Sequence, residues 1–158
     1  MTMVEQDHAA TLQGIRPVHT LGRSASSATT GPASSRRTYR VPSGNPPPWW
    51  PEAEDRLSEL LALREGWDTY SAPPVADEVV HAVIAFLWLF ATDAKTTPWV
   101  VPTSLGGLQL EWHKPDLSVE VCFAPGTAPT VYIEDAGDEV EGPLPALATA
   151  WSGVLSRL

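Results

Sequence analysis

The chain has 158 residues, 43% of them hydrophobic, and a formal net charge of −9 at pH 7. This length leaves room for one domain with a tail, because single cores usually occupy roughly 100–150 residues. Five arginines against two acidic residues give residues 1–48 a balance of +3, whereas residues 49–158 carry 17 acidic and five basic residues, a balance of −12. An acidic body repels phosphate backbones, so nucleic acid is a poor partner for it, although the tail could make weak contact.

The sequence also bounds the compartment in which the protein works. Cys122 is the only cysteine, which excludes an intramolecular disulfide and fits a reducing environment. The N-terminus lacks the basic and apolar regions of a secretory signal. The longest apolar run, residues 82–91, has about half the length that a transmembrane helix needs. We therefore expect a cytoplasmic protein with no membrane partner.

Residues 1–48 are predicted to be a disordered basic tail, rich in Ser, Thr, Ala, Gly and Pro. They show no periodic apolar pattern, so they cannot bury enough surface to offset their ordering entropy. The tail leads into a proline–tryptophan segment with two interpretations: a linear motif for an aromatic groove, or a stiff linker whose tryptophans dock on the body. This segment consists of Pro46, Pro47, Pro48, Trp49 and Trp50.

Two helices are predicted before any strand. Residues 51–64 combine a proline at the first helical position with acidic residues in the first turn and apolar residues at helical spacing. Gly66 is expected to cap this helix. A second helix is expected to begin near Val75 or Ala76. It is apolar on nearly every side from Ala82 to Ala91, so we expect a central helix covered from more than one direction.

Four strands with turn signals between them are predicted over residues 99–103, 107–113, 117–123 and 130–134, followed by a helix over residues 145–158. The whole prediction is a single α+β domain over residues 49–158. It comprises two N-terminal helices, a four-stranded antiparallel meander and a C-terminal helix, arranged in two layers.

Alternation along these strands gives the sheet one apolar face and one polar face. We choose the register in which apolar residues of neighbouring strands lie opposite one another. This register places Glu111 opposite Glu120, and Glu120 opposite Glu134, as a row of three carboxylates. A two-residue slip would keep the faces and stagger the row. The predicted binding residues on this face are Glu111, Glu120, Glu134, His113, Gln109 and Tyr132.

Three interpretations of the carboxylate row stay open, because like charges opposite each other destabilise a sheet. The row could be a solvated polar face, or a surface for a basic protein or for the chain's own Arg36, Arg37 and Arg40. It could also be a metal site or an acid–base pair. No closely spaced metal ligands are visible, and His81 and His113 are isolated. No catalytic residue, metal ligand or cofactor is therefore predicted.

Two segments have a predicted structural role. Asp68 is expected to bond nearby backbone N–H groups in a turn, Trp67 and Trp112 to fill the core, and Gly106-Gly107 to form a hairpin turn. The residues of this structural motif are Gly66, Trp67, Asp68, Tyr70, Gly106, Gly107 and Trp112.

These segments, Gly66-Trp67-Asp68 with Tyr70, Ala72 and Pro73 and then Gly106-Gly107 with Leu110-Glu111-Trp112, resemble a group of small bacterial and phage-associated proteins of unassigned function. The group's pattern reads Gly-Trp-Asp-Gly-Tyr-x-Ala, a helix, and Asp-Gly-Gly-(x)2–3-Leu-Glu-Trp. The resemblance covers approximately residues 57–134. The chain departs from it at Thr69 and at Ser104-Leu105, where the group has glycine and a preceding aspartate. The resemblance implies one domain and a bacterial origin, and no activity.

The favoured hypothesis is a non-enzymatic, acidic protein-binding module that recognises a basic protein, in the style of antitoxin, immunity or inhibitor proteins. One alternative is a small metal-dependent or acid–base hydrolase that uses Glu111, Glu120, Glu134 and His113. A further alternative is a structural subunit of a bacterial or phage assembly. Whether the protein is an enzyme stays open at this point.

Overall fold

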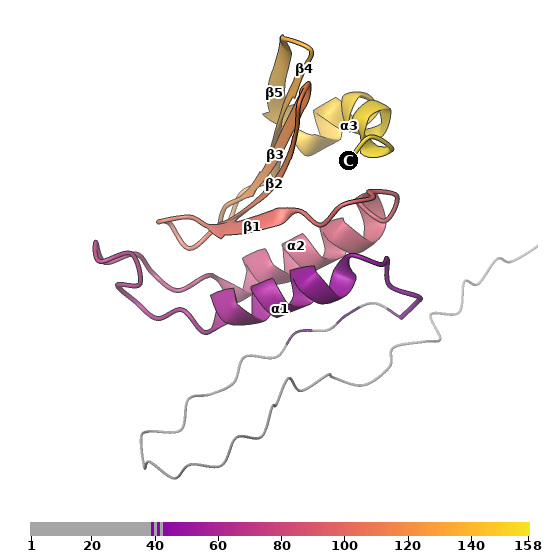
Figure 1. The fold of residues 1–158 in the computed structure, drawn as a ribbon. Helices are drawn as coiled ribbons and strands as arrows, with labels where there is room; N and C mark the ends of the chain where they lie inside the picture. Colours follow the sequence, from indigo (N-terminus) through magenta and orange to yellow (C-terminus); the bar gives the residue numbers. More distant parts are fainter. Residues whose placement is uncertain (1–38, 40, 42) are drawn as a thin grey trace, which may run out of the picture.

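The computed structural model describes residues 39, 41 and 43–158 (Figure 1). The predictions for residues 1–38, 40 and 42, and with them Arg36, Arg37 and Arg40, lie outside the described residues. The described chain forms an α+β fold of three α-helices, one 3-10 helix and five strands. Their bounds are α1 Trp50–Leu61, α2 Asp77–Phe90, β1 Trp99–Pro102, β2 Leu108–Lys114, β3 Leu117–Phe123, β4 Thr130–Asp135, β5 Asp138–Pro143, η1 Leu144–Leu147 and α3 Ala148–Leu155.

Helix α1 forms as predicted but ends three residues early, at Leu61. The N–H groups of Ala62 and Leu63 donate to the carbonyls of Glu59 and Leu60, and these i→i−3 bonds tighten and end the helix. The prediction that Gly66 caps α1 is therefore wrong. Gly66 instead adopts φ 78° and donates its N–H to Ala72 O at 2.8 Å, which closes the loop after the helix.

Helix α2 is central but is not covered on every side. It buries Val79, Val80, Val83, Ile84, Phe86 and Leu87. Ala82, Ala85 and Leu89 form an exposed stripe at helical spacing, and Leu89 is 70% exposed. The apolar sequence of α2 therefore predicts more burial than the helix has. Two positions of the exposed stripe are alanines, which carry little apolar surface.

The sheet has five strands in the order β1-β2-β3-β4-β5, and every neighbouring pair is antiparallel. The sequence analysis missed β5, a strand whose residues are exposed except for the half-buried Gly142. Asp138, Glu139 and Glu141 have low strand propensity, and Val140 alone gives no visible alternation. The turn before it, Ala136-Gly137, has φ 53° and 93°, which is typical of a two-residue hairpin.

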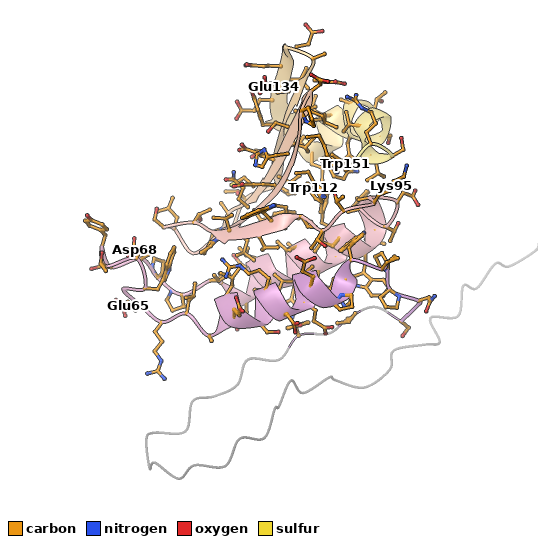
Figure 2. The ribbon with its side chains drawn as sticks, viewed as in Figure 1. Glu65, Asp68, Lys95, Trp112, Glu134 and Trp151 are labelled. Carbon is orange, nitrogen blue, oxygen red and sulfur yellow. The ribbon has the colours of Figure 1, made fainter. Side chains whose placement is uncertain are left out.

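The core lies between the apolar face of the sheet and helices α2 and α3. The predicted inward residues of β2 and β3 are all 3% exposed or less. Phe86 of α2 joins both layers, since its ring centroid lies 5.5 Å from that of Phe123 and 5.1 Å from that of Trp151. Figure 2 shows Trp112 and Trp151 together on the side of the sheet that faces α3, with Glu134 on the other side.

The C-terminal helix is shorter than predicted: a 3-10 turn covers Leu144–Leu147, and α3 covers Ala148–Leu155. Its buried residues Trp151 and Val154 belong to the predicted apolar stripe. Trp151 Nε1 donates to Phe90 O at 2.8 Å, so the indole ties α3 to the end of α2.

The core also takes in aromatic residues that precede α1. Trp49 and Trp50 are 6% and 4% exposed, and Trp49 Nε1 donates to Ala94 O at 2.9 Å. This packing corresponds to the linker interpretation, since a partner could not reach either indole without displacing it from the core. Tyr39, which the sequence analysis placed in the tail, is 7% exposed, and its hydroxyl lies 3.5 Å from Glu54 Oε1. Burial raises its pKa to about 12.

Candidate functional site

The polar face of the sheet has the predicted register between β2 and β3. Glu111 is opposite Glu120, Gln109 is opposite Cys122, and His113 is opposite Ser118. A two-residue turn joins these strands, so turn geometry and alternation select the same pairing. The predicted register between β2 and β3 is therefore confirmed.

The predicted register between β3 and β4 is wrong by two residues. Tyr132 lies opposite Glu120, and Glu134 lies opposite Ser118, so the three carboxylates do not form one row. A two-residue slip keeps every side chain on its own face, and the apolar pattern could not discriminate against it. The observed register places a phenol rather than a third carboxylate beside Glu120, which avoids further like-charge opposition.

The loop between β3 and β4 fixes this register. Its turn is closed by the N–H of Thr127, which donates to Ala124 O at 3.3 Å. The N–H of Gly126 donates to Glu78 Oε1 of α2 at 2.9 Å, so the loop is attached to the central helix. Neither contact follows from the alternation of the strands.

One row of residues crosses the polar face from β1 to β5, with aromatic rings on both sides of a carboxylate pair. The register of the five strands aligns Trp99, Glu111, Glu120, Tyr132 and Glu141 in this order. Trp99 is 72% exposed. The sequence analysis did not select it, because Trp99-Val100-Val101 carries no polar alternation. Only the pairing of Trp99 with Glu111 shows that its side chain belongs to the polar face.

Hydrogen bonds hold the paired carboxylates of Glu111 and Glu120 in place. Gln109 Nε2 donates to Glu111 Oε1 at 3.1 Å and to Glu120 Oε2 at 2.8 Å. His113 Nε2 lies 3.2 Å from Glu111 Oε2, and its Nδ1 lies 2.9 Å from Ser118 Oγ. The amide of Gln109 therefore offsets part of the repulsion between the two glutamates, and the face keeps its negative charge.

Two further side chains of this face, the phenol of Tyr132 and the thiol of Cys122, are neutral near pH 7. Burial, and then the Glu139 and Glu134 carboxylates, raise the pKa of Tyr132 above its usual value. Burial, followed by the charge of Glu120, likewise raises the pKa of the Cys122 thiol. A thiol with a raised pKa is a weak nucleophile, since the thiolate is the reactive form.

Five carboxylates lie on the polar face, because Glu139 and Glu141 of β5 pair with Glu134 and Tyr132 of β4. No lysine or arginine occupies this face of the five strands, and His113 is its one basic side chain. Among the described residues, no group of three or more His, Cys, Asp and Glu side chains is arranged to hold a metal ion.

A groove of about 660 Å³ lies beside Trp99, between α1 and β1. Arg56 at its side donates from Nε to Val100 O at 3.1 Å and pairs with Glu59 through Nη1 at 3.0 Å. Its lining includes Glu52, Asp55, Glu59, Arg56 and Trp99. The groove therefore extends the acidic surface around the Trp99 indole.

The two predicted structural segments meet in space. A Cβ atom added at Gly106 would lie 3.1 Å from Pro74 O and 3.4 Å from Pro73 Cγ. Gly106 O also accepts the N–H of Ala76 at 2.9 Å, next to the start of α2. Trp67 Nε1 donates to Pro73 O at 3.1 Å, and Trp67 is only half-buried, so it lies outside the core it was predicted to fill.

Asp68 accepts backbone hydrogen bonds as predicted, from Tyr70 N at 2.8 Å and Ala72 N at 3.0 Å. These bonds, led by that of Ala72, hold the pKa of Asp68 below its usual value. They also stabilise a loop in which Thr69 and Ser71 adopt positive φ, 66° and 73°. Tyr70 is 87% exposed, so its ring contributes little to the fold.

We expect Asp68→Ala to lower the melting temperature, with an effect that depends on pH. Because the folded pKa is lowered, the stabilisation is fully present above the unfolded value of about 4 and is lost as the pH falls through the folded pKa. Thermal melts of parent and variant should therefore differ most near neutral pH and converge in acid. Asp68→Asn, which keeps a carbonyl acceptor, is the control. A difference that grows in acid would contradict this role.

Comparison of the chain with protein-family models, with curated proteins and with solved structures finds no match. No helix among the described residues is long and apolar enough to cross a bilayer.

Proposed function

We propose that this protein is a non-enzymatic binding module whose acidic sheet face recognises a basic surface of another protein. The observation that carries the proposal is the row across the sheet, in which Trp99 and Tyr132 flank the Glu111–Glu120 pair. Carboxylates provide the charge complementarity, and exposed aromatic rings provide the apolar contact that interface hot spots use.

The chemistry of the face supports binding more than catalysis. The amide of Gln109 bridges both paired carboxylates, and the Cys122 thiol has a raised pKa. A lysine or arginine from a partner would instead find preoriented acceptors beside an indole, where cation–π attraction adds to the ion pair. The net charge of the body, −12 over residues 49–158, would speed the encounter with a basic partner.

Removing negative charges from the acidic face is expected to weaken the binding of the partner strongly. The variant carries Glu111→Gln, Glu120→Gln and Glu134→Gln, and the partner is first captured from host cells with the tagged parent. We expect an affinity loss of about tenfold or more and a weaker dependence on salt, because such charges act largely through steering. Titration calorimetry at two salt concentrations measures both.

The matched control removes three acidic charges from exposed positions outside the sheet face and the groove, by Glu65→Gln, Asp77→Asn and Asp93→Asn. This control should keep affinity within about threefold, since long-range charge alone contributes modestly in salt. Equal losses in both variants would show that only net charge matters. A partner that binds the face variant as well as the parent would overturn the proposal.

A further inference from the structure

The free edge of β5 offers a partner backbone hydrogen-bonding groups, whereas the polar face beside it offers side chains. Asp135 and Asp138 flank the two-residue turn at Ala136-Gly137, so they form a pair that exchanges backbone hydrogen bonds. Alternation then directs the backbone N–H and C=O groups of Glu139 and Glu141 away from β4. Within the described chain β5 is the last strand, so these groups face no further strand.

The opposite edge of the sheet is closed. Arg56 Nε donates to Val100 O of β1 at 3.1 Å, Pro98 and Pro102 lie at the ends of that strand, and α1 lies along it. Prolines and covering helices are common ways to block an edge strand. Figure 1 shows β5 at the end of the sheet away from α1, where no helix covers its free side. Of the two edges of the sheet that the described residues form, the β5 edge is therefore the one open to an added strand.

The side chains of β5 define what an added strand would carry. Glu139 and Glu141 lie on the polar face, whereas Val140 lies on the core face. Val140 is 42% exposed although its partner Ile133 is only 3% exposed, so the core face is incompletely covered at this edge. A neighbouring strand with basic, apolar and basic residues in alternation would pair both carboxylates and cover Val140.

We infer that β5 receives an extended segment of the basic partner, in which lysine or arginine alternates with apolar residues, as a sixth strand of the sheet. This inference rests on the proposed function and specifies how the partner binds. Main-chain hydrogen bonds would supply affinity, and alternate side chains would supply specificity. A second copy of the chain fits poorly, because two β5 edges would oppose glutamates to glutamates.

The test uses capped eight-residue peptides in which four lysines alternate with four valines. In one peptide the backbone nitrogens of the lysines are methylated. This blocks the edge of the peptide whose backbone groups would bond to Glu139 and Glu141. In the matched peptide the valines are N-methylated, which blocks only the outer edge. Both carry the same charge and the same number of methyl groups. We expect the lysine-methylated peptide to bind at least about tenfold more weakly than the other two.

Two further measurements locate the contact. Amide hydrogen exchange at Glu139 and Glu141 should slow on binding of the unmodified peptide, because both amides gain acceptors. Glu141→Pro removes one outward-facing backbone N–H group and leaves the hydrogen bonds between β4 and β5 intact. It should therefore lower the affinity of the unmodified peptide. Glu141→Gln removes the charge but keeps the amide, and Glu141→Pro should lose more affinity than this control.

Equal binding of both methylated peptides, unchanged exchange at Glu139 and Glu141, or no binding of the unmodified peptide would overturn the edge inference. A dimer of the free protein with both amides protected would do so as well. The proposed function is tested separately: if the methylated peptides bind equally and the triple glutamine variant still weakens them, the acidic face stands and the edge inference fails.

Discussion

Replacing Trp112 by alanine is expected to destabilise the domain by about 3–5 kcal/mol, the usual cost of emptying a buried aromatic site. Trp112 is 2% exposed and packs edge-on against Trp151 at a centroid distance of 5.8 Å. Its Nε1 donates to Thr96 O at 3.1 Å, so the truncation also removes the hydrogen bond that holds the segment before β1. Chemical denaturation of parent and variant measures the change.

Trp99→Ala provides a control of the same residue type. Trp99 is largely exposed on the polar face, so its truncation should change stability by no more than about 0.5 kcal/mol. Glu111 and His113 are the neighbours of Trp112 in the sequence and lie on the polar face. Their alanine variants should change stability by no more than the same amount. If Trp99→Ala or Glu111→Ala proved as costly as Trp112→Ala, the two faces of the sheet would be inverted.

Gly107→Ala is expected to destabilise the domain by about 1–3 kcal/mol, as overpacking of a close contact usually does. The added Cβ would lie 2.5 Å from the carbonyl oxygen of Phe123 and 2.7 Å from Thr103 Oγ1. The first of these is a backbone atom of β3, so relief would require β2 and β3 to separate. Thermal and chemical denaturation report the loss.

The control for this substitution is Gly153→Ala in α3, where an added Cβ meets nothing within 4 Å. Alanine at an exposed helical position should stabilise the domain by about 0.5–1 kcal/mol, because glycine loses more backbone entropy on folding. A neutral Gly107→Ala would mean that the strands near Phe123 are more loosely packed than the distances indicate.

The sequence predicted those parts of the fold in which two independent signals agree. Residues 108–114 and 117–123 alternate strongly and are joined by a two-residue turn, and their predicted faces and register are those observed. Helix α2 combines acidic residues in its first turn with a long apolar stretch. In such segments local propensity and burial favour the same structure.

The parts that were missed depend on tertiary contacts. The register of β4 is fixed by a loop bound to Glu78, and a two-residue slip leaves the pattern of faces unchanged. Strand β5 forms at an edge, where burial imposes no alternation. Tyr39 is a single aromatic residue in a polar segment, and only its packing near Glu54 places it in the core.

The candidate site was predicted only in part, both in its residues and in their arrangement. Glu111, Glu120, His113 and Gln109 do lie together, as alternation required. Glu134 is displaced by two residues, while Tyr132 takes its place beside Glu120. Trp99 and the carboxylates of β5 were absent from the prediction, because neither edge strand shows a polar pattern that assigns its faces.

The most direct test of the acidic face is a map of where the captured partner contacts the protein. Nuclear magnetic resonance of the labelled protein would follow backbone amides and the Trp99 indole during titration with the partner. The account predicts that the largest changes occur on the polar face and along the β5 edge, at Trp99, Gln109, Glu111, Glu120, Tyr132, Glu139 and Glu141. Changes confined to the exposed stripe of α2 around Leu89, with the sheet face unaffected, would contradict it.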